Sequence, residues 1–283
     1  MNLPEEGPAL EWPRERKSVP LQYRWLRGVH PLRLRASLAF RMRFPDLTSA
    51  ICSYPFAPLE FAPEFKMQLF PTDTAHRQIW LTGFMELTLS RWIAKEARAG
   101  GLLVDVGANA GYFTLLWLRG GRENRAYCFE PGRRPVQYLA ANLEGNRLTG
   151  RATVDRRAVG AEAGRMAFDP GHEDQTGWGG LVPASSAATV ETEVVRLDDV
   201  FDTSERISVL KIDVEGADTW VLEGAERLLA SGAVRTVFFE HNEPRMKALG
   251  VDPGRATEFL RRLGFRVSPL RGTHGTEWIA TRG

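Results

Sequence analysis

Residues 104–112 read VDVGANAGY, and this stretch decides the fold. Leu102 to Val104 form an apolar run, the acid Asp105 follows, and Gly107 and Gly111 lie on either side of Asn109. The pattern predicts a buried strand, a tight glycine turn and then a helix over 112–120. In a parallel sheet, a strand-to-helix turn of this kind is the usual place for a nucleotide ligand.

The chain beyond this turn alternates between short apolar runs and helical segments. This alternation predicts an α/β fold with a doubly wound, mostly parallel sheet. Residues 169–188, rich in Gly, Pro and Ser, are expected to form a loop. We expect strands at 102–106, 125–131, 152–159, 207–214, 234–242, 265–270 and 276–282, and further helices at 133–146, 217–232 and 253–264.

The region before this sheet is expected to be a separate, mainly helical unit. We place a cap or oligomerisation region at 1–98 and the catalytic domain at 99–283. Residues 72–97 show an apolar period near 3.6 and predict one helix, capped by Thr72 or Asp73. Between Arg14 and Arg43 there are eight arginines and one lysine against a single acid. This segment is either a basic arm for a membrane surface, an acidic partner or a nucleic acid, or a solvated helical appendage whose arginine stems cover apolar surface.

The composition excludes several classes of protein. A formal net charge of +2 on 283 residues is too small for general binding of nucleic acid. Two cysteines make neither a disulfide framework nor a metal cluster, so a cytoplasmic setting is expected. The acidic, proline-containing start does not resemble a signal peptide, and no apolar stretch reaches membrane-spanning length.

The residues of the turn indicate which nucleotide it holds. A dinucleotide turn needs glycine where this chain has Asn109. Asp105 would repel a pyrophosphate but suits the ammonium and sulfonium groups of S-adenosylmethionine. Glu130 ends the next strand, where an acid can accept the two ribose hydroxyls. The alternative is that the glycines only shape a corner and Asp105 caps the next helix.

Six segments resemble the FkbM family of S-adenosylmethionine-dependent methyltransferases. The resemblance extends from about Leu102 to Phe265, and its most specific part is the block KIDVEGAD with VLEGA. Asp218 departs mildly from the family, which has Glu at that position. The segments are LLVDVGANAGYFTLLW (102–117), YCFEP (127–131), RRAVG (156–160), VVRLDDV (194–200), VLKIDVEGADTWVLEGAERLL (209–229) and VFFEHN (237–242).

This resemblance implies a class I, Rossmann-like methyltransferase with a seven-strand sheet, which transfers methyl groups usually to hydroxyls. It implies that Glu130 holds the ribose and that Arg157, Ala158 and Val159 lie by the adenine. The methionine part of the donor would be lined by Asp105, Gly107, Asn109 and Gly111.

Acidic residues follow the fourth and fifth strands of the catalytic domain. Asp213 and Glu215 end one strand, and Glu240 and His241 end the other, so all four are expected at one edge of the sheet. Methyl transfer to a hydroxyl needs a proton acceptor, for which Asp213 or His241 is suited. A second hypothesis is that Asp213, Glu215 and Glu240 hold a divalent cation such as Mg²⁺. Glu215 and Asp218 could instead cap the following helix.

The loop at 169–188 contains His172 and Trp178 among glycines. An aromatic side chain between glycine hinges suits a lid over the substrate. With Glu215 and Glu240, these two residues are the expected substrate contacts. A disordered insertion is the alternative.

The sequence therefore predicts an S-adenosylmethionine-dependent O-methyltransferase that acts on a small-molecule hydroxyl of a natural product or sugar. The alternative is a nucleic-acid methyltransferase that uses the arginine-rich arm. Its expected Asn/Asp-Pro-Pro-aromatic run is replaced by IDVEGAD at 212–218, so nucleic acid is an unfavoured partner. No stable membrane insertion is expected, and a homo-oligomer is possible.

Overall fold

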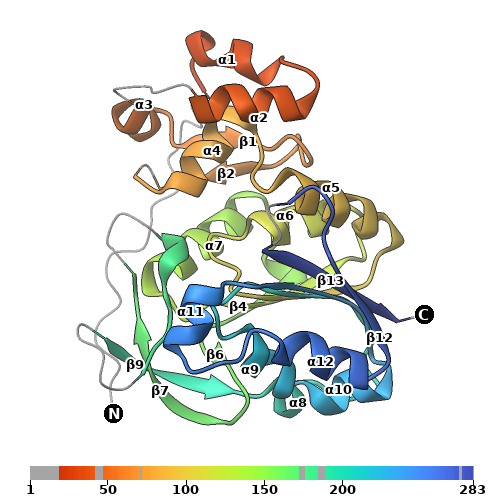
Figure 1. Ribbon diagram of the computed structural model, residues 1–283. Coiled ribbons are helices and arrows are strands. Elements are labelled where there is room, and N and C mark those ends of the chain that lie inside the picture. Colours follow the sequence, from red (N-terminus) through yellow and green to blue (C-terminus); the bar gives the residue numbers. More distant parts are fainter. Residues whose placement is uncertain are drawn as a thin grey trace.

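The computed structural model describes residues 19–41, 47–70, 72–171, 176–183, 189–273 and 276–282. A twisted sheet with helices on both faces makes up most of it, and smaller N-terminal elements cover one side (Figure 1). No helix among these residues has the length and apolar character needed to cross a membrane.

The main sheet has seven strands in the order β12-β13-β11-β10-β3-β4-β5. Every neighbouring pair from β11 to β5 is parallel, and only β13 runs antiparallel to both of its neighbours. The sequence prediction of a doubly wound, mostly parallel sheet is confirmed. The strands are β3 (Leu102–Val106), β4 (Arg125–Phe129), β5 (Ala152–Asp155), β10 (Ile207–Ile212), β11 (Val234–Glu240), β12 (Phe265–Pro269) and β13 (Glu277–Arg282).

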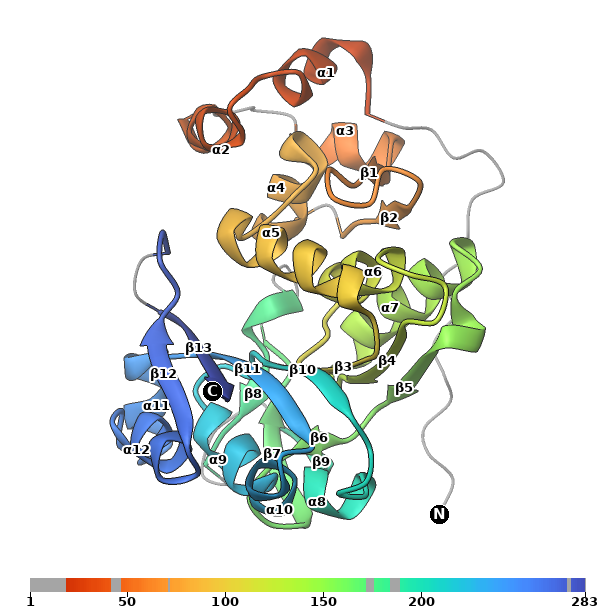
Figure 2. The ribbon, with the colours of Figure 1, turned by 90° about the vertical axis from the view of Figure 1, so that its right-hand side faces the viewer.

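Helices cover the sheet on both faces, as Figure 2 shows from its edge. Alternating residues of β3 explain the two layers, because Leu103 belongs to one buried apolar cluster and Val104 to the other. On the Leu103 side lie α5 (Leu87–Glu96), α6 (Tyr112–Arg119) and α7 (Arg133–Gly145). On the Val104 side lie α8 (Leu197–Val200), α9 (Asp218–Glu223), α10 (Glu226–Ser231) and α12 (Arg255–Arg262).

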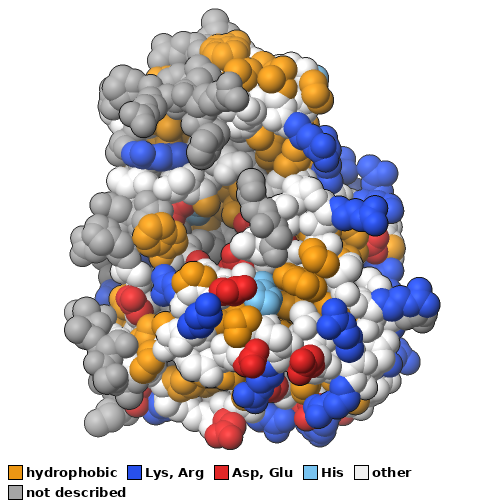
Figure 3. Space-filling view, viewed as in Figure 1, with side chains coloured by type: hydrophobic (Ala, Val, Ile, Leu, Met, Phe, Trp, Pro, Cys, Tyr) orange, Lys and Arg blue, Asp and Glu red, His pale blue; other side chains and the backbone are white. Residues whose placement is uncertain are grey.

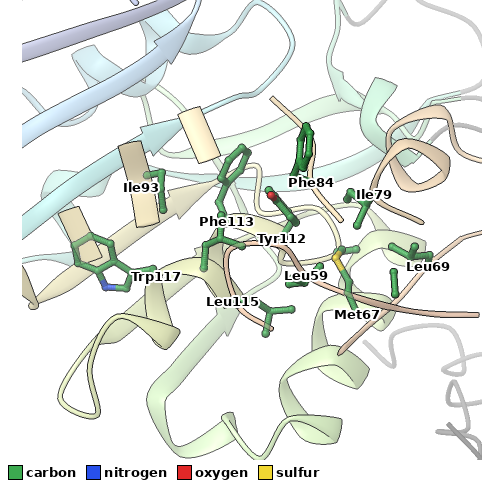
Figure 4. Close-up of a cluster of buried hydrophobic side chains, with 14 of the residues drawn as sticks. Leu59, Met67, Leu69, Ile79, Phe84, Ile93, Tyr112, Phe113, Leu115 and Trp117 are labelled. Atoms are coloured by element: carbon green, nitrogen blue, oxygen red, sulfur yellow. The ribbon is translucent and has the colours of Figure 1, made fainter. Parts of the chain in front are cut away.

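The N-terminal elements share the core of the sheet domain. A single buried cluster includes Leu59 and Ile79 from this region together with Phe113 and Trp117 of α6 (Figure 4). The expected boundary at 98–99 therefore cuts through one continuous core. The elements are α1 (Leu21–Arg27), α2 (Leu32–Arg41), α3 (Leu47–Ser53), β1 (Phe56–Pro58), β2 (Lys66–Gln68) and α4 (Thr74–Thr82).

Two arginines of the arginine-rich segment serve the fold. Arg27 donates hydrogen bonds to the carbonyl oxygens of Pro58, Ile79 and Trp80. Arg35, 1% exposed, donates to the carbonyl of Thr82 and forms an ion pair of 2.6 Å with Glu60. Both side chains satisfy carbonyl groups near the end of α4, so they are not available to a partner. Arg14, Arg16, Lys17 and Arg43 lie outside the described residues.

The single helix expected over 72–97 is wrong, because the structure breaks it into α4 and α5. Asp73 caps α4 by accepting a hydrogen bond from the backbone N–H of His76, as expected. Gly83 then takes φ 87° and ends α4, a frequent role of glycine after a helix. Glu86 precedes α5 with φ 39°, also in the left-handed region.

A second sheet, of four strands in the order β6-β9-β7-β8, was not expected from the sequence. The strand expected over 152–159 divides after Asp155, and its second part joins β9 as a parallel partner. The predicted loop at 169–188 contains the short strand β8. The strands are β6 (Ala158–Val159), β7 (Gly164–Asp169), β8 (Gly180–Leu181) and β9 (Val190–Val195).

Candidate active site

A cavity of about 240 Å³ opens at the carboxyl ends of β3, β4 and β10. It lies at the reversal of strand order, where β3 has β10 on one side and β4 on the other. Acidic side chains are visible in the hollow near the middle of the face in Figure 3. The wall includes Glu86, Gly107, Asn109, Glu130, Arg157, Ala158, Trp178, Asp213, Glu215 and Glu240.

The turn after β3 is shaped by close backbone contacts. A Cβ atom on Gly107, at φ 77°, would lie 1.9 Å from the carbonyl oxygen of Asp213, so only glycine fits there. Asn109 also has positive φ, and its buried Oδ1 has no hydrogen-bond partner among the described residues. An unpaired buried acceptor on a cavity wall favours a ligand that donates a hydrogen bond.

Glu130 joins this turn to the end of β4. Its two carboxylate oxygens accept hydrogen bonds of 2.8 Å from the backbone N–H groups of Asn109 and Gly132. Burial raises the pKa of Glu130 to about 7, although the two N–H groups oppose the change. Each oxygen keeps a second lone pair, so the carboxylate can still accept ligand hydroxyls.

Lys211 of β10 holds two acids of the site together. Its Nζ lies 3.2 Å from Asp105 Oδ1, 3.4 Å from Asp213 Oδ2 and 2.8 Å from the carbonyl oxygen of Gly107. Burial alone would lower the pKa of Lys211, but Asp105 and Asp213 raise it above its usual value. The lysine is therefore a fixed positive charge behind the cavity.

A smaller chamber of about 50 Å³ adjoins the cavity. Glu86, Asp213 and Glu240 line both spaces, so these acids stand where the two meet. The chamber continues towards Glu277 and Trp278 of β13. Its remaining wall is mostly apolar and contains Leu89, Ile212, Phe238 and Phe239, with Lys211 as the one cation among the described lining residues.

Comparison with known proteins now gives the family. The Methyltransferase FkbM domain matches residues 105–267, which is more than half of the chain. The chain belongs to this family. It is 35% identical over 167 residues to "31-O-demethyl-FK506 methyltransferase FkbM" of Streptomyces tacrolimicus. That match covers 46% of this chain and 62% of the relative, so it spans less than two thirds of the relative's length.

A second relative of this chain is "Hexuronic acid methyltransferase AglP" of Haloferax volcanii. It is 25% identical over 177 residues, covering 62% of this chain and 67% of that protein. Among solved structures, a SAM-dependent O-methyltransferase from Thermotoga maritima has a TM-score of 0.43 and 12% identity, covering 70% of this chain and 66% of its own. These structural scores add nothing to the family assignment.

Most site residues expected from the sequence lie at the cavity, but three of those that the structure describes do not. Asp105 is fully buried, paired with Lys211 and hydrogen-bonded by the Thr114 hydroxyl at 2.7 Å, so it supports the turn from behind. Gly111 packs on Leu139 instead of lining the cavity. The ring of His241 lies beside Trp278, outside both spaces, because successive residues at a strand end point to opposite faces. His172 lies outside the described residues.

The hypothesis of a divalent-cation site finds no support in the described residues. Asp213, Glu215 and Glu240 all line the cavity. However, no group of three acidic, histidine or cysteine side chains in the described parts of the chain is arranged to hold a metal ion. Glu215 is instead engaged by Asn242, whose Nδ2 donates to it at 3.1 Å, and by Arg245 at 3.8 Å.

Arg245 of α11 (Glu243–Ala248) and Asn242 were not expected at the site. Arg245 donates a hydrogen bond of 3.0 Å to the carbonyl oxygen of Trp178 and so ties the loop over the cavity to α11. Trp178 itself is 58% exposed while still lining the cavity. A sequence signal existed for Asn242, since Asn followed by Glu-Pro is typical of a helix start.

The acids of the site are only partly compensated, by Lys211 beside Asp213 and by Arg245 beside Glu215. Burial, and then the charge of Asp213, raises the pKa of Glu215 to about 7 and that of Glu240 to about 9. The one cation among the described residues of the cavity wall, Arg157, is paired with Asp155 at 2.6 Å. A ligand with positive charge would relieve this repulsion.

Proposed function

We propose that this protein transfers a methyl group from S-adenosylmethionine to a hydroxyl group of a small molecule. One observation carries the proposal: a cavity at the reversal of strand order has one end walled by several carboxyl groups, and two of them, Glu86 and Glu240, have no cationic partner among the described residues. A methyl donor with a sulfonium and an ammonium group fits that wall, whereas a dinucleotide pyrophosphate would be repelled. Family membership supports the same donor.

Each part of the proposed donor has a candidate contact in the cavity wall. Glu130 would accept the ribose hydroxyls, and Ala158 and Arg157 would lie beside the adenine. The free Oδ1 of Asn109 would accept a hydrogen bond from the ammonium group. The bound donor supplies an electrophilic methyl carbon. Asp213, oriented by Lys211, would then stand at the reacting end with Glu240.

The hydroxyl class of acceptor rests on chemistry and on the relatives. A hydroxyl must lose its proton during methylation, and the carboxyl groups around the small chamber can receive it. The names of both relatives refer to methylation of small molecules, one at an oxygen and one on a hexuronic acid. A small-molecule alcohol is therefore the proposed acceptor, with no metal ion assigned to the reaction.

Isothermal titration calorimetry with S-adenosylmethionine, S-adenosylhomocysteine and NAD tests the donor. Both adenosyl ligands are expected to bind, and NAD is not. Binding of NAD alone, or of none of the three, would overturn the proposal. The variant Asp213→Asn should keep S-adenosylhomocysteine binding, since Lys211 still holds the strand end through Gly107 and Asp105.

A further inference from the structure

Glu86 occupies a strained position between α4 and α5. Its backbone lies in the left-handed region, with φ 39° and ψ 65°. Residues other than glycine pay free energy for this conformation, and such residues concentrate at functional sites. Glu86 also stands at the N-cap of α5, where a carboxylate normally accepts a backbone N–H, but its side chain makes no such hydrogen bond. The left-handed conformation of Glu86 is therefore not explained by capping of α5.

The side chain of Glu86 points to where the cavity and the small chamber meet, because it lines both. None of the hydrogen bonds or ion pairs found within the described ranges involves its carboxyl group. The nearby Lys211 is occupied by Asp105, Asp213 and the carbonyl oxygen of Gly107. Glu86 is thus an acid that faces two open spaces without a partner of its own.

The neighbours of Glu86 add negative charge. The pKa of Glu86 is raised to about 8, mainly by burial and then by the charges of Asp213 and Glu277. The charge of Lys211 acts in the opposite direction. Glu277 is the direct cross-strand partner of Glu240 in the antiparallel pair β11 and β13. Like charges placed opposite each other in this way destabilise a sheet. This cluster of acids therefore disfavours the ligand-free protein and favours binding of a positively charged ligand.

Two of these acids come from outside the matched family domain. That domain covers residues 105–267, so Glu86 precedes it and Glu277 follows it. The reacting end is consequently completed by the N-terminal elements and by the last strand. Any role of Glu86 is a property of this chain's own flanking segments.

We propose that Glu86 faces the sulfonium of the bound methyl donor and then receives the proton of the acceptor hydroxyl. This inference rests on the proposed function. The hydroxyl oxygen forms a bond to the methyl carbon, the bond between that carbon and sulfur breaks with its electron pair remaining on sulfur, and the hydroxyl proton passes to the Glu86 carboxylate. The summed charge of the sulfonium and the Glu86 carboxyl group is zero before and after, since sulfonium and carboxylate become thioether and carboxylic acid.

This assignment predicts that the protein senses the charge of its ligand through Glu86. S-adenosylmethionine carries the positive sulfonium, S-adenosylhomocysteine lacks it, and sinefungin carries an amine-bearing carbon in its place. Glu86→Gln should weaken binding of S-adenosylmethionine and sinefungin about tenfold at pH 8.5, where the wild-type acid is largely ionised. The affinity for S-adenosylhomocysteine should change less than about twofold, which also shows that the variant is folded.

The matched control is Glu243→Gln, which removes an exposed acid on α11 that pairs with Lys247 at 3.5 Å. It should leave the affinities for all three ligands unchanged. Equal weakening of all three ligands by Glu86→Gln, or no change in any, would overturn the assignment to Glu86. If the wild-type protein itself binds none of them, the proposed function fails instead.

A second measurement follows the pH-dependence of ligand binding. The ratio of affinities for S-adenosylmethionine and S-adenosylhomocysteine should rise in the wild-type protein between pH 6.5 and 9, because the carboxylate form of Glu86 becomes populated. The sulfonium lowers the pKa of the ligand's own ammonium group, so the same ratio is measured in Glu86→Gln to subtract that contribution. The groups acting on Glu86 are Asp213, Glu277, Lys211 and Asp105. A pH-dependence that is the same in Glu86→Gln would exclude Glu86 as its source.

Discussion

The two ends of the cavity are built in opposite ways. At the end assigned to adenosine, each charge has its partner: two backbone N–H groups hold Glu130, and Asp155 holds Arg157. Behind the turn, Lys211 compensates Asp105. At the reacting end, Asp213 is paired with Lys211, but Glu86 has no hydrogen-bond or ion-pair partner within the described part of the chain, and Glu240 stands opposite Glu277. One end is complete without a ligand, and the other is balanced only when a positive ligand is present.

This difference teaches where stability and function are separated in the site. Compensated charges stabilise the fold, and removing one partner leaves the other buried and unpaired. Acids without a cationic partner lower the stability of the free protein, and binding of a positively charged ligand restores that stability. Substitutions at the first end should therefore appear in unfolding experiments, and those at the second in ligand binding and pH-dependence.

The largest effect is expected for Lys211→Met. The variant leaves Asp105, which is fully buried, without its cation, so unfolding should become easier by about 3–5 kcal/mol in urea titrations. Arg255→Met is the control, because it breaks the exposed ion pair with Glu223 and should cost less than about 1 kcal/mol. Equal losses in the two variants would contradict the view that this end is a compensated charge network.

A smaller effect is expected for Glu130→Gln. A glutamine has one oxygen, so either Asn109 or Gly132 would present its N–H to another donor. We expect a loss of about 1–2 kcal/mol in stability and about tenfold weaker binding of S-adenosylhomocysteine by calorimetry. Glu144→Gln, an exposed change on α7, should do neither. Unchanged binding in Glu130→Gln would remove Glu130 from the donor contacts.

The smallest effect is expected from pH on the free protein. The pKa values of Glu86 and Glu240 are raised to about 8 and about 9, so the folded state binds protons more tightly than the unfolded chain. Stability should therefore fall as pH rises from 6 to 9, by roughly 5 °C in melting temperature. Saturating S-adenosylmethionine should flatten this slope. A melting temperature that rises with pH would mean that the reacting end is already compensated.

Much of the sheet and the donor end was predictable from the sequence. The apolar runs predicted the seven strands of the main sheet, except that the strand expected over 152–159 ends at Asp155. The central strands gave the clearest signal, since a strand buried on both faces leaves a continuous apolar run. The turn at 104–112 and the acid Glu130 were found because both follow strands directly. Asp105 was expected to line the ligand but lies behind the turn. A sequence does not show that Lys211, more than a hundred residues later, pairs with it.

The reacting end was largely hidden. Residues 72–97 keep a helical period on both sides of Gly83, so the pattern favoured one helix and gave Glu86 no special place. The signal that could have found the break is Gly83 itself, since glycine in the left-handed conformation commonly ends a helix. His241 was expected as a proton acceptor because histidine titrates near neutral pH. Side chains alternate between the two faces at the end of the strand, however, and it is Glu240 that lines the cavity.

The break between α4 and α5 fixes the length of the segment that joins them. Leu89 and Ile93 of α5 are buried in the same cluster as Leu115 of α6, so α5 cannot turn about its axis without exposing them. Each helical residue advances about 100° around that axis. Deleting one residue between Glu86 and Leu89 would thus turn the acid by about a quarter circle away from the chamber. The length of that short stretch is therefore part of what places Glu86 at the chamber.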